Sequence, residues 1–177
     1  MITESALCGP RNEGTRPWKR GDQIATPRTR HPLPQARKYL LASVVSGRPA
    51  WCDVFGLPFW EDLARRPDVA AVFDRAMCVQ VDELGRSLAE AFDWGSVRVV
   101  ADIGGGLGHV LTTLLNRRPR LRGVLVDLPA TIDRASKIVD ASVSDRLILL
   151  GHDFFDDLDL PDVDTCLLVH VVPAPLP

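Results

Sequence analysis

The spacing of apolar residues changes along this chain, from a helical repeat before residue 94 to short apolar runs after it, and the change divides the chain into two parts. Between residues 39 and 93, apolar side chains recur at the spacing of an α-helix. This pattern predicts three helices: residues 37–46, 60–66 and 68–92. Gly47 and Pro67 are expected to end the first two, and Gly85 is where the third could break or kink. The region is therefore predicted to be helical.

From residue 94 onward, short apolar and β-branched runs alternate with helical segments. Four such runs are predicted as strands: residues 97–102, 123–127, 146–150 and 165–172. One helix is expected after the first strand and another over residues 129–139. Apolar strands joined by helices are typical of a parallel sheet that is covered on both faces. We therefore predict an α/β fold preceded by helices.

One turn in this second part is rich in glycine. Asp102 ends the first strand, and Gly104, Gly105, Gly106 and Gly108 follow before a helix begins. Glycine removes the Cβ atom that would keep a ligand off the backbone, and it permits positive φ where the chain reverses. The helix that follows directs unpaired N–H groups to the same place. The turn is therefore a candidate ligand site.

The spacing of these glycines disfavours a dinucleotide. A dinucleotide-binding turn has the pattern Gly-x-Gly-x-x-Gly, and counted from Gly104 its third glycine would fall on His109. Asp102 would also place a carboxylate close to the phosphates. A ligand with a positive end and no phosphate, such as S-adenosylmethionine, suits the turn better. A plain turn that joins a strand to a helix stays open as the alternative.

Acidic residues also follow the second and third strands. Because ligands of parallel sheets bind at the carboxyl ends of the strands, we expect Asp102, Asp127 and Asp153 with Phe154 to gather at one edge. A carboxylate at Asp127 can accept hydrogen bonds from both hydroxyls of a ribose. A carboxylate beside an aromatic ring, as at Asp153 and Phe154, could hold an adenine.

Charge and composition set the boundaries of the chain's parts. Residues 1–38 contain eight Lys or Arg against three Asp or Glu and are rich in proline, so we predict a disordered segment. Its charges do not line one helical face, which disfavours a nucleic-acid arm. The predicted parts are a basic segment over 1–38, a helical lead-in over 39–93 and a ligand-binding domain over 94–177.

Other sequence features limit the location and chemistry of the protein. No apolar run approaches the roughly 18 residues that a membrane helix needs, and the N-terminus lacks the apolar core of a signal peptide. We therefore expect a cytoplasmic protein without a membrane span. The four cysteines are scattered, which indicates neither a metal site nor a disulfide framework and predicts four free thiols.

Three motifs together resemble the small-molecule O-methyltransferases related to the plant caffeic acid enzymes. The motifs are Ala101–Gly108, Gly123–Pro129 and Gly151–Phe155, and the likeness extends over residues 40–172. Bacterial members of that family act on polyketides and other secondary metabolites. The resemblance implies a Rossmann-like methyltransferase sheet and the transfer of a methyl group from S-adenosylmethionine to a hydroxyl of a small aromatic or polyketide-like acceptor.

The same resemblance assigns roles to individual residues. The glycines would face the methionine part of the cofactor, Asp127 the ribose, and Asp153 with Phe154 the adenine. Asp102 and Leu128 are also assigned to the binding of the cofactor. Phe55, Trp60 and Met77 would lie near the acceptor pocket. The aromatic-rich stretch that contains the first two could equally be plain core.

The chain departs from the family's pattern at the fourth strand. There the family has Lys or Arg at the position of Val169 and a His-Asp-Trp motif whose histidine is the general base, but here that histidine is replaced by Pro173. His170 would lie on the opposite face of the predicted strand. His109 and His152 are interpreted as local hydrogen-bonding residues. We therefore predict no catalytic residue in this chain and impaired methyl transfer.

Family members are homodimers, with an N-terminal dimerisation domain that residues 1–38 cannot supply. Their sheet has the strand order 3-2-1-4-5-7-6, and only the first four strands are expected here. We therefore expect a fragment with an open apolar edge at the fourth strand. The alternatives are a non-catalytic remnant that binds S-adenosylmethionine or a partner, and an NAD-dependent oxidoreductase, which Asp102 and His109 disfavour.

Overall fold

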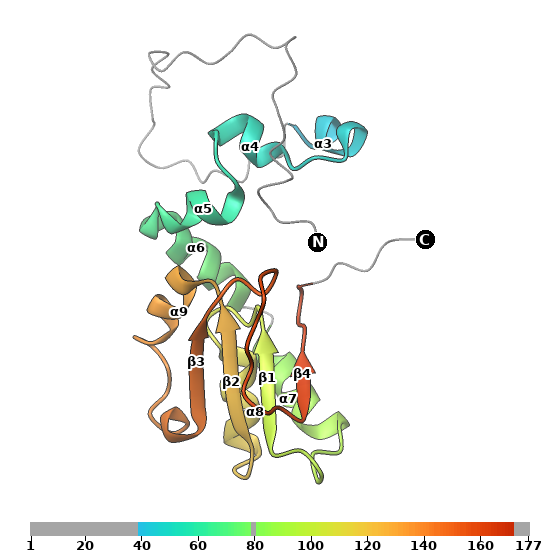
Figure 1. Ribbon diagram of the computed structural model, residues 1–177, viewed down its shortest axis with the longest axis vertical. Coiled ribbons are helices and arrows are strands. Elements are labelled where there is room, and N and C mark those ends of the chain that lie inside the picture. The colour runs from blue at the N-terminus through green and yellow to red at the C-terminus, as the bar shows by residue number, and fades with distance from the viewer. Residues whose placement is uncertain (1–38, 79–80, 172–177) are drawn as a thin grey trace. The chain divides into compact units, whose positions relative to one another are not determined.

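Figure 1 shows a computed structural model of the chain, which describes residues 39–78 and 81–171. The predicted disordered segment 1–38 and Pro173 lie outside the described residues. The chain divides into two compact units between Ala70 and Ala71, within helix α6.

The first unit is built from short helices around one buried tryptophan. Its helices are α3 (Leu40–Ser46), α4 (Ala50–Phe55), α5 (Phe59–Ala64) and the start of α6 (Pro67–Cys78). Gly47 and Gly56, with φ of 67° and 79°, end α3 and α4 in the left-handed conformation that glycine accepts without strain. Helix α4 lies in the aromatic-rich stretch, where no helix was predicted.

Trp51 connects α4 to α5 by a buried hydrogen bond. Its Nε1 donates to the Asp62 carboxylate at 2.9 Å, and Arg66 also donates to that carboxylate. The Trp51 ring lies 4.4 Å from the ring of Phe55 and 4.8 Å from the ring of Phe59, measured between centroids. The only buried carboxylate described in this unit is thus paired, and the partly buried rings of Phe55 and Phe59 pack against the buried Trp51.

The second unit is a parallel sheet with helices. After α6 come α7 (Val81–Ala91), β1 (Val99–Ile103), α8 (His109–Arg117), β2 (Arg122–Asp127) and α9 (Pro129–Ala135), then a 3₁₀ turn (Ser144–Arg146), β3 (Leu147–Gly151) and β4 (Thr165–Leu167). All described strand pairs are parallel, in the order β3-β2-β1-β4. The predicted α/β fold and its strand order are confirmed.

The two faces of this sheet are covered differently. One face packs against helices, through a cluster that includes Leu111, Leu114 and Leu115 of α8. The other face packs against the segment between β3 and β4, through Phe154, Leu158, Leu160 and Val163. Figure 1 shows this segment crossing in front of the strands. The prediction of two covered faces holds, with a loop on one side.

Three further contacts fix the helices of the second unit, two of them between helices and one between α7 and the segment that follows it. Arg134 of α9 pairs with Asp74 of α6, with 2.8 Å between Nε and Oδ2. The indole of the buried Trp94 donates to the carbonyl oxygen of Leu88 at 3.0 Å. Gly85 is buried where α7 meets α8, and a Cβ atom there would lie 2.8 Å from Cβ of Thr113.

Three sequence predictions are corrected. Helix α7 runs through Gly85 without a break, and that glycine admits a close neighbour; the described helical residues of the predicted helix over 68–92 lie in α6 and α7. Strand β4 ends at Leu167, and His170 has φ of 58°, which no strand residue adopts. The argument that placed His170 on one face of a strand therefore does not apply.

Cys52 is disulfide-bonded, so the prediction of four free thiols is wrong for this residue. The spacing of cysteines along a chain does not reveal which ones folding brings together. Among the described helices, none combines the length and the apolar character that crossing a membrane requires.

Candidate cofactor site

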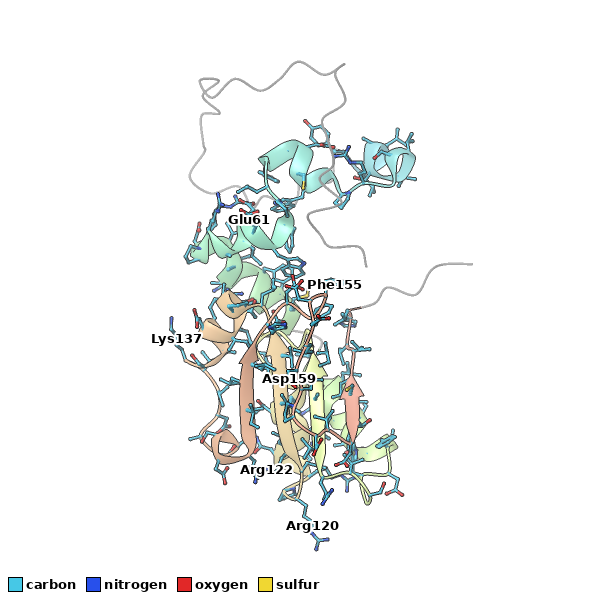
Figure 2. All side chains as sticks on the ribbon, viewed as in Figure 1. Glu61, Arg120, Arg122, Lys137, Phe155 and Asp159 are labelled. Atoms are coloured by element: carbon cyan, nitrogen blue, oxygen red, sulfur yellow. The ribbon has the colours of Figure 1, made fainter. Side chains whose placement is uncertain are left out.

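The carboxyl ends of β1, β2 and β3 form one edge of the second unit. Ile103 pairs with Val126, and Asp127 pairs with Gly151, so the residues that follow these three strands meet at this edge. Figure 2 shows Phe155 at this end of the sheet and Arg122 at the opposite end. The predicted gathering of Asp102, Asp127 and the segment that contains Asp153 agrees with this register.

The glycine turn between β1 and α8 has a backbone that other residues rarely adopt. Gly104, Gly106 and Gly108 have φ of 69°, 60° and 78°. The N–H of Gly104 donates to the carbonyl oxygen of Val126 at 2.8 Å, which attaches the turn to the end of β2. The turn is therefore held in one place by the sheet beneath it.

The four glycines meet different surroundings. A Cβ atom at Gly105 would lie 2.6 Å from the Asp102 carboxyl carbon, and one at Gly108 would lie 2.9 Å from Leu125. A Cβ atom at Gly104 would lie 2.7 Å from the Val171 side chain and 3.3 Å from the Phe154 ring. At Gly106 a Cβ atom would meet nothing within 4 Å. Gly106 is thus the member of this turn that faces open space.

Asp127 is fixed at the end of β2 by two backbone donors. The Gly106 N–H donates to Oδ2 at 2.8 Å, and the Leu128 N–H donates to Oδ1 at 2.8 Å. A carboxylate oxygen accepts more than one hydrogen bond, so both oxygens keep capacity for a ligand. The bond to Gly106 was not predicted from the sequence, since it joins residues 21 positions apart.

Asp102 is the most buried carboxylate of the edge. Its side chain is 1% exposed, and neither oxygen has a hydrogen-bond partner among the described residues. Burial, and secondly the negative charge of Asp127, raise the pKa of Asp102 to about 7. Buried polar groups are normally paired, so an unpaired carboxylate beneath a glycine turn makes Asp102 a candidate residue of a ligand site.

The segment after β3 contributes an aromatic side chain. The Phe155 N–H donates to the Asp153 carboxylate at 3.0 Å, and the rings of Phe154 and Phe155 lie 4.6 Å apart. Phe154 is also the ring next to Gly104. The structure thus brings Phe154 to the glycine turn, while a role for Asp153 and Phe154 toward adenine stays a prediction.

His109 and His152 were interpreted as residues that form local hydrogen bonds. The His152 N–H donates to the backbone oxygen of Asp127 at 2.9 Å, and the Nε2 atom lies 3.0 Å from the backbone oxygen of Asp157. His109 is the first residue of α8. His152 is therefore a local hydrogen-bonding residue, as expected.

The predicted acceptor residues lie in different units. Phe55 and Trp60 belong to the first unit, where Phe55 packs on Trp51 and the ring of Trp60 lies 4.7 Å from that of Phe59. Met77 lies on α6 in the second unit and is 49% exposed. Their shared role at an acceptor pocket stays a prediction. Within the described ranges, no group of three His, Cys, Asp or Glu residues could hold a metal ion.

Comparison with known proteins identifies the family. The sequence pattern of the O-methyltransferase domain matches residues 37–173. The chain belongs to this O-methyltransferase family. The match includes β1 to β4 and the glycine turn, and also the helices before them, so the resemblance found in the motifs is confirmed.

Individual relatives differ in the reactions that their names state. Aclacinomycin 10-hydroxylase RdmB of Streptomyces purpurascens is 40% identical over 134 residues, which cover 75% of this chain and 36% of that protein. Phenazine O-methyltransferase PhzM of Lysobacter antibioticus is 32% identical over 117 residues, which cover 66% of this chain and 34% of that protein. The chain thus spans about a third of the length of these O-methyltransferase-family relatives.

A solved family member provides a comparison with ligands. The O-methyltransferase NcsB1 from neocarzinostatin biosynthesis, in complex with S-adenosylmethionine and 2-hydroxy-5-methyl naphthoic acid, aligns with a TM-score of 0.63 and 33% identity. The alignment covers 71% of this chain and 39% of NcsB1. The fold of the described residues is therefore that of a Rossmann-like methyltransferase.

Proposed function

We propose that this chain binds S-adenosylmethionine as part of an O-methyltransferase that acts on a hydroxyl of a small aromatic or polyketide-like metabolite. The observation that carries the proposal is the open face of Gly106, which lies next to Asp127 in a turn that covers the buried carboxyl of Asp102. This edge has open space at Gly106 and the two acidic side chains of Asp102 and Asp127, and its sequence lacks the Gly-x-Gly-x-x-Gly pattern of a dinucleotide-binding turn. Such a combination suits a cationic nucleoside.

The proposed contacts follow the order of the strands. Asp102 and the glycines Gly104, Gly105, Gly106 and Gly108 would surround the methionine part. Asp127 would accept hydrogen bonds from the ribose hydroxyls while the Gly106 and Leu128 N–H groups hold it in place. Asp153 and Phe154 would contact the adenine. The bound cofactor would supply an electrophilic methyl group, and the residues of this chain would orient it.

The acceptor is proposed from relatives whose names state phenazine, a dihydroxy-methyl-naphthoate and mitomycin biosynthesis. Flat, hydroxylated rings suit apolar and aromatic side chains. The family resemblance makes Phe55, Trp60 and Met77 the candidates for contacts with the acceptor. Homodimerisation stays a prediction from the family resemblance, and a cytoplasmic location stays a prediction from the sequence pattern.

Transfer to a hydroxyl also needs removal of its proton as the oxygen attacks the methyl group. A positioned base contributes roughly 10²- to 10⁴-fold to such a step. The sequence has Pro173 where the family has its histidine base. We therefore propose that this chain binds the cofactor but transfers methyl groups slowly.

A second candidate is hydroxylation, because the relative that is 40% identical is named a hydroxylase. The two reactions give products of different mass from one aromatic acceptor. Hydroxylation would place one oxygen atom of O₂ on the acceptor, and two electrons from a reductant would reduce the other oxygen atom to water. Incubation in air with S-adenosylmethionine, a thiol reductant and a panel of hydroxylated naphthoates and anthracyclines, followed by mass spectrometry, separates a methylated product from a hydroxylated one.

Binding is tested first, by thermal-shift titration of the 177-residue chain with S-adenosylmethionine, S-adenosylhomocysteine and NAD. We expect a rise in melting temperature with both adenosyl compounds and none with NAD. Stabilisation by NAD alone would overturn the proposal. Stabilisation by the adenosyl compounds without any product would favour the non-catalytic alternative.

A further inference from the structure

Asp102 is surrounded by groups that oppose its ionisation. Leu125 of β2 and Leu167 of β4 pair with it on either side within the sheet, and Gly105 covers its carboxyl group. Neither of its oxygens accepts a hydrogen bond from any described residue. An ionised carboxylate without partners in such surroundings is costly, so the neutral form is favoured in the absence of ligand.

The charges near Asp102 act in the same direction. Asp127 at the end of β2 is the charged group that acts on it, and its effect is to raise the pKa. Helix α8 begins with His109, whereas the described part of β4 consists of Thr165, Cys166 and Leu167 and carries no acidic or basic side chain. The pKa of Asp102 consequently lies near 7, where a nearby positive charge would have the greatest effect on its protonation.

We propose that Asp102 gives this site a preference for the positively charged sulfonium of S-adenosylmethionine over the neutral thioether of S-adenosylhomocysteine, by releasing its own proton when the cation binds. The inference rests on the proposed function. The step is a proton transfer: the O–H bond of the Asp102 carboxyl breaks, the electron pair stays on the carboxylate oxygen, and the proton passes to the buffer.

The position of Asp102 makes this possible even where the carboxyl group does not touch the sulfur atom itself. The backbone of Gly105 lies against the carboxyl group, close enough that an added Cβ atom would be 2.6 Å from the carboxyl carbon. Neighbouring Gly106 faces open space. A ligand on this turn would be separated from Asp102 by little more than a glycine backbone, and charges interact strongly over such distances when water is excluded.

The two ligands provide a matched comparison. They share the adenosine and amino-acid parts and differ by one methyl group and one positive charge at sulfur. Any effect of shape or hydrogen bonding is therefore nearly common to both, whereas an effect of charge appears with S-adenosylmethionine alone. An acidic group that must lose its proton makes the affinity for a cation rise with pH, by roughly tenfold per pH unit at most.

The test is titration calorimetry of the 177-residue chain with both ligands at pH 6, 7 and 8, in two buffers that differ in heat of ionisation. We expect S-adenosylmethionine to release up to one more proton than S-adenosylhomocysteine at pH 6, where the amino groups of both ligands are protonated. The affinity ratio of S-adenosylmethionine to S-adenosylhomocysteine should rise several-fold from pH 6 to pH 8.

Asp102→Asn is the informative variant, since it keeps the shape and cannot ionise. It should remove both the extra proton release and the pH dependence of the affinity ratio. Asp156→Asn is the matched control, because this exposed carboxylate follows β3 and belongs to neither the glycine turn nor the proposed contacts. It should behave as the parent does.

Equal proton release with the two ligands in the parent would overturn the inference, and this measurement needs no variant to fold. An unchanged affinity ratio in Asp102→Asn would also overturn it, while leaving cofactor binding intact. Failure of both ligands to bind the parent would instead reject the proposed function, and this inference with it.

Discussion

Asp127 and Gly106 act together at the scale of single residues. The carboxylate at the end of β2 accepts the N–H of a glycine whose own φ is positive, so the conformation of the turn and the position of the carboxylate depend on each other. This pairing explains why the turn can be open at Gly106 and still be held in one conformation. Substitutions at the two positions should therefore have related but distinguishable effects.

Asp127→Asn tests the carboxylate. The amide keeps the shape but loses the charge, and its NH₂ group would face one of two backbone donors. We expect cofactor affinity to fall by about 2 kcal/mol, or ~30-fold in Kd, as charge-assisted hydrogen bonds are lost. Calorimetry with S-adenosylhomocysteine measures this, and parent-like affinity would refute a ribose contact at Asp127.

Gly106 has a matched control in the first unit. Gly106 and Gly56 both have left-handed φ, and a Cβ atom at either would meet nothing within 4 Å. Alanine should therefore cost about 1 kcal/mol of stability at each position, by its backbone conformation alone. Gly106→Val should in addition abolish cofactor binding, whereas Gly56→Val should not. Thermal denaturation and ligand titration together separate the two effects.

At the scale of helices and strands, the periodicity of apolar residues predicted the type of fold but not the role of Gly85 or the length of β4. Apolar strands separated by helical segments were sufficient to predict a parallel sheet and the edge where Asp102 and Asp127 meet, whereas the strand order was predicted from the family resemblance. The role of Gly85 was not predictable, because its neighbour Thr113 lies on another helix. The length of β4 was overestimated, since Leu168 to Val172 are rich in β-branched residues yet His170 has positive φ. Contacts between distant residues decide such cases.

The contact between α7 and α8 predicts that a glycine-to-alanine substitution inside a helix will lower the stability of the protein. Replacing a glycine inside a helix with alanine usually stabilises it, by about 1 kcal/mol. Gly85→Ala should instead destabilise the chain by about 1–3 kcal/mol, because the new Cβ would lie 2.8 Å from the Cβ of Thr113. Urea denaturation measures the change. Combining it with Thr113→Gly should recover part of the loss, and a stabilised single variant would contradict the packing.

At the scale of the whole molecule, Asp102 and Asp164 make the stability of the folded protein depend on pH in opposite directions. The folded state raises the pKa of Asp102 from 3.8 to about 7, chiefly by burial. The Asp164 carboxylate accepts the N–H groups of Val99 and Arg98, each at 2.8 Å, and these bonds lower its pKa below 3.8. Asp164 thereby attaches the start of β4 to the start of β1.

These shifts predict a stability profile with two declines. Between pH 3.8 and about 7 the folded state binds more protons at Asp102 than the unfolded state, so stability falls as pH rises, by up to about 1.4 kcal/mol per pH unit. Below pH 3.8 the contribution of Asp164 is lost as pH falls. Asp102→Asn should flatten the first decline and Asp164→Ala the second, as measured by thermal melts from pH 3 to 8.

Each unit also contains its own buried indole, and this makes the two units optically distinguishable. Trp51 donates to a carboxylate in the first unit, and Trp94 donates to a backbone carbonyl in the second. A buried indole next to a negative charge differs in emission from one next to a neutral oxygen. With Trp18 and Trp60 replaced by phenylalanine, fluorescence during denaturation would report whether the units unfold in one cooperative step or in two.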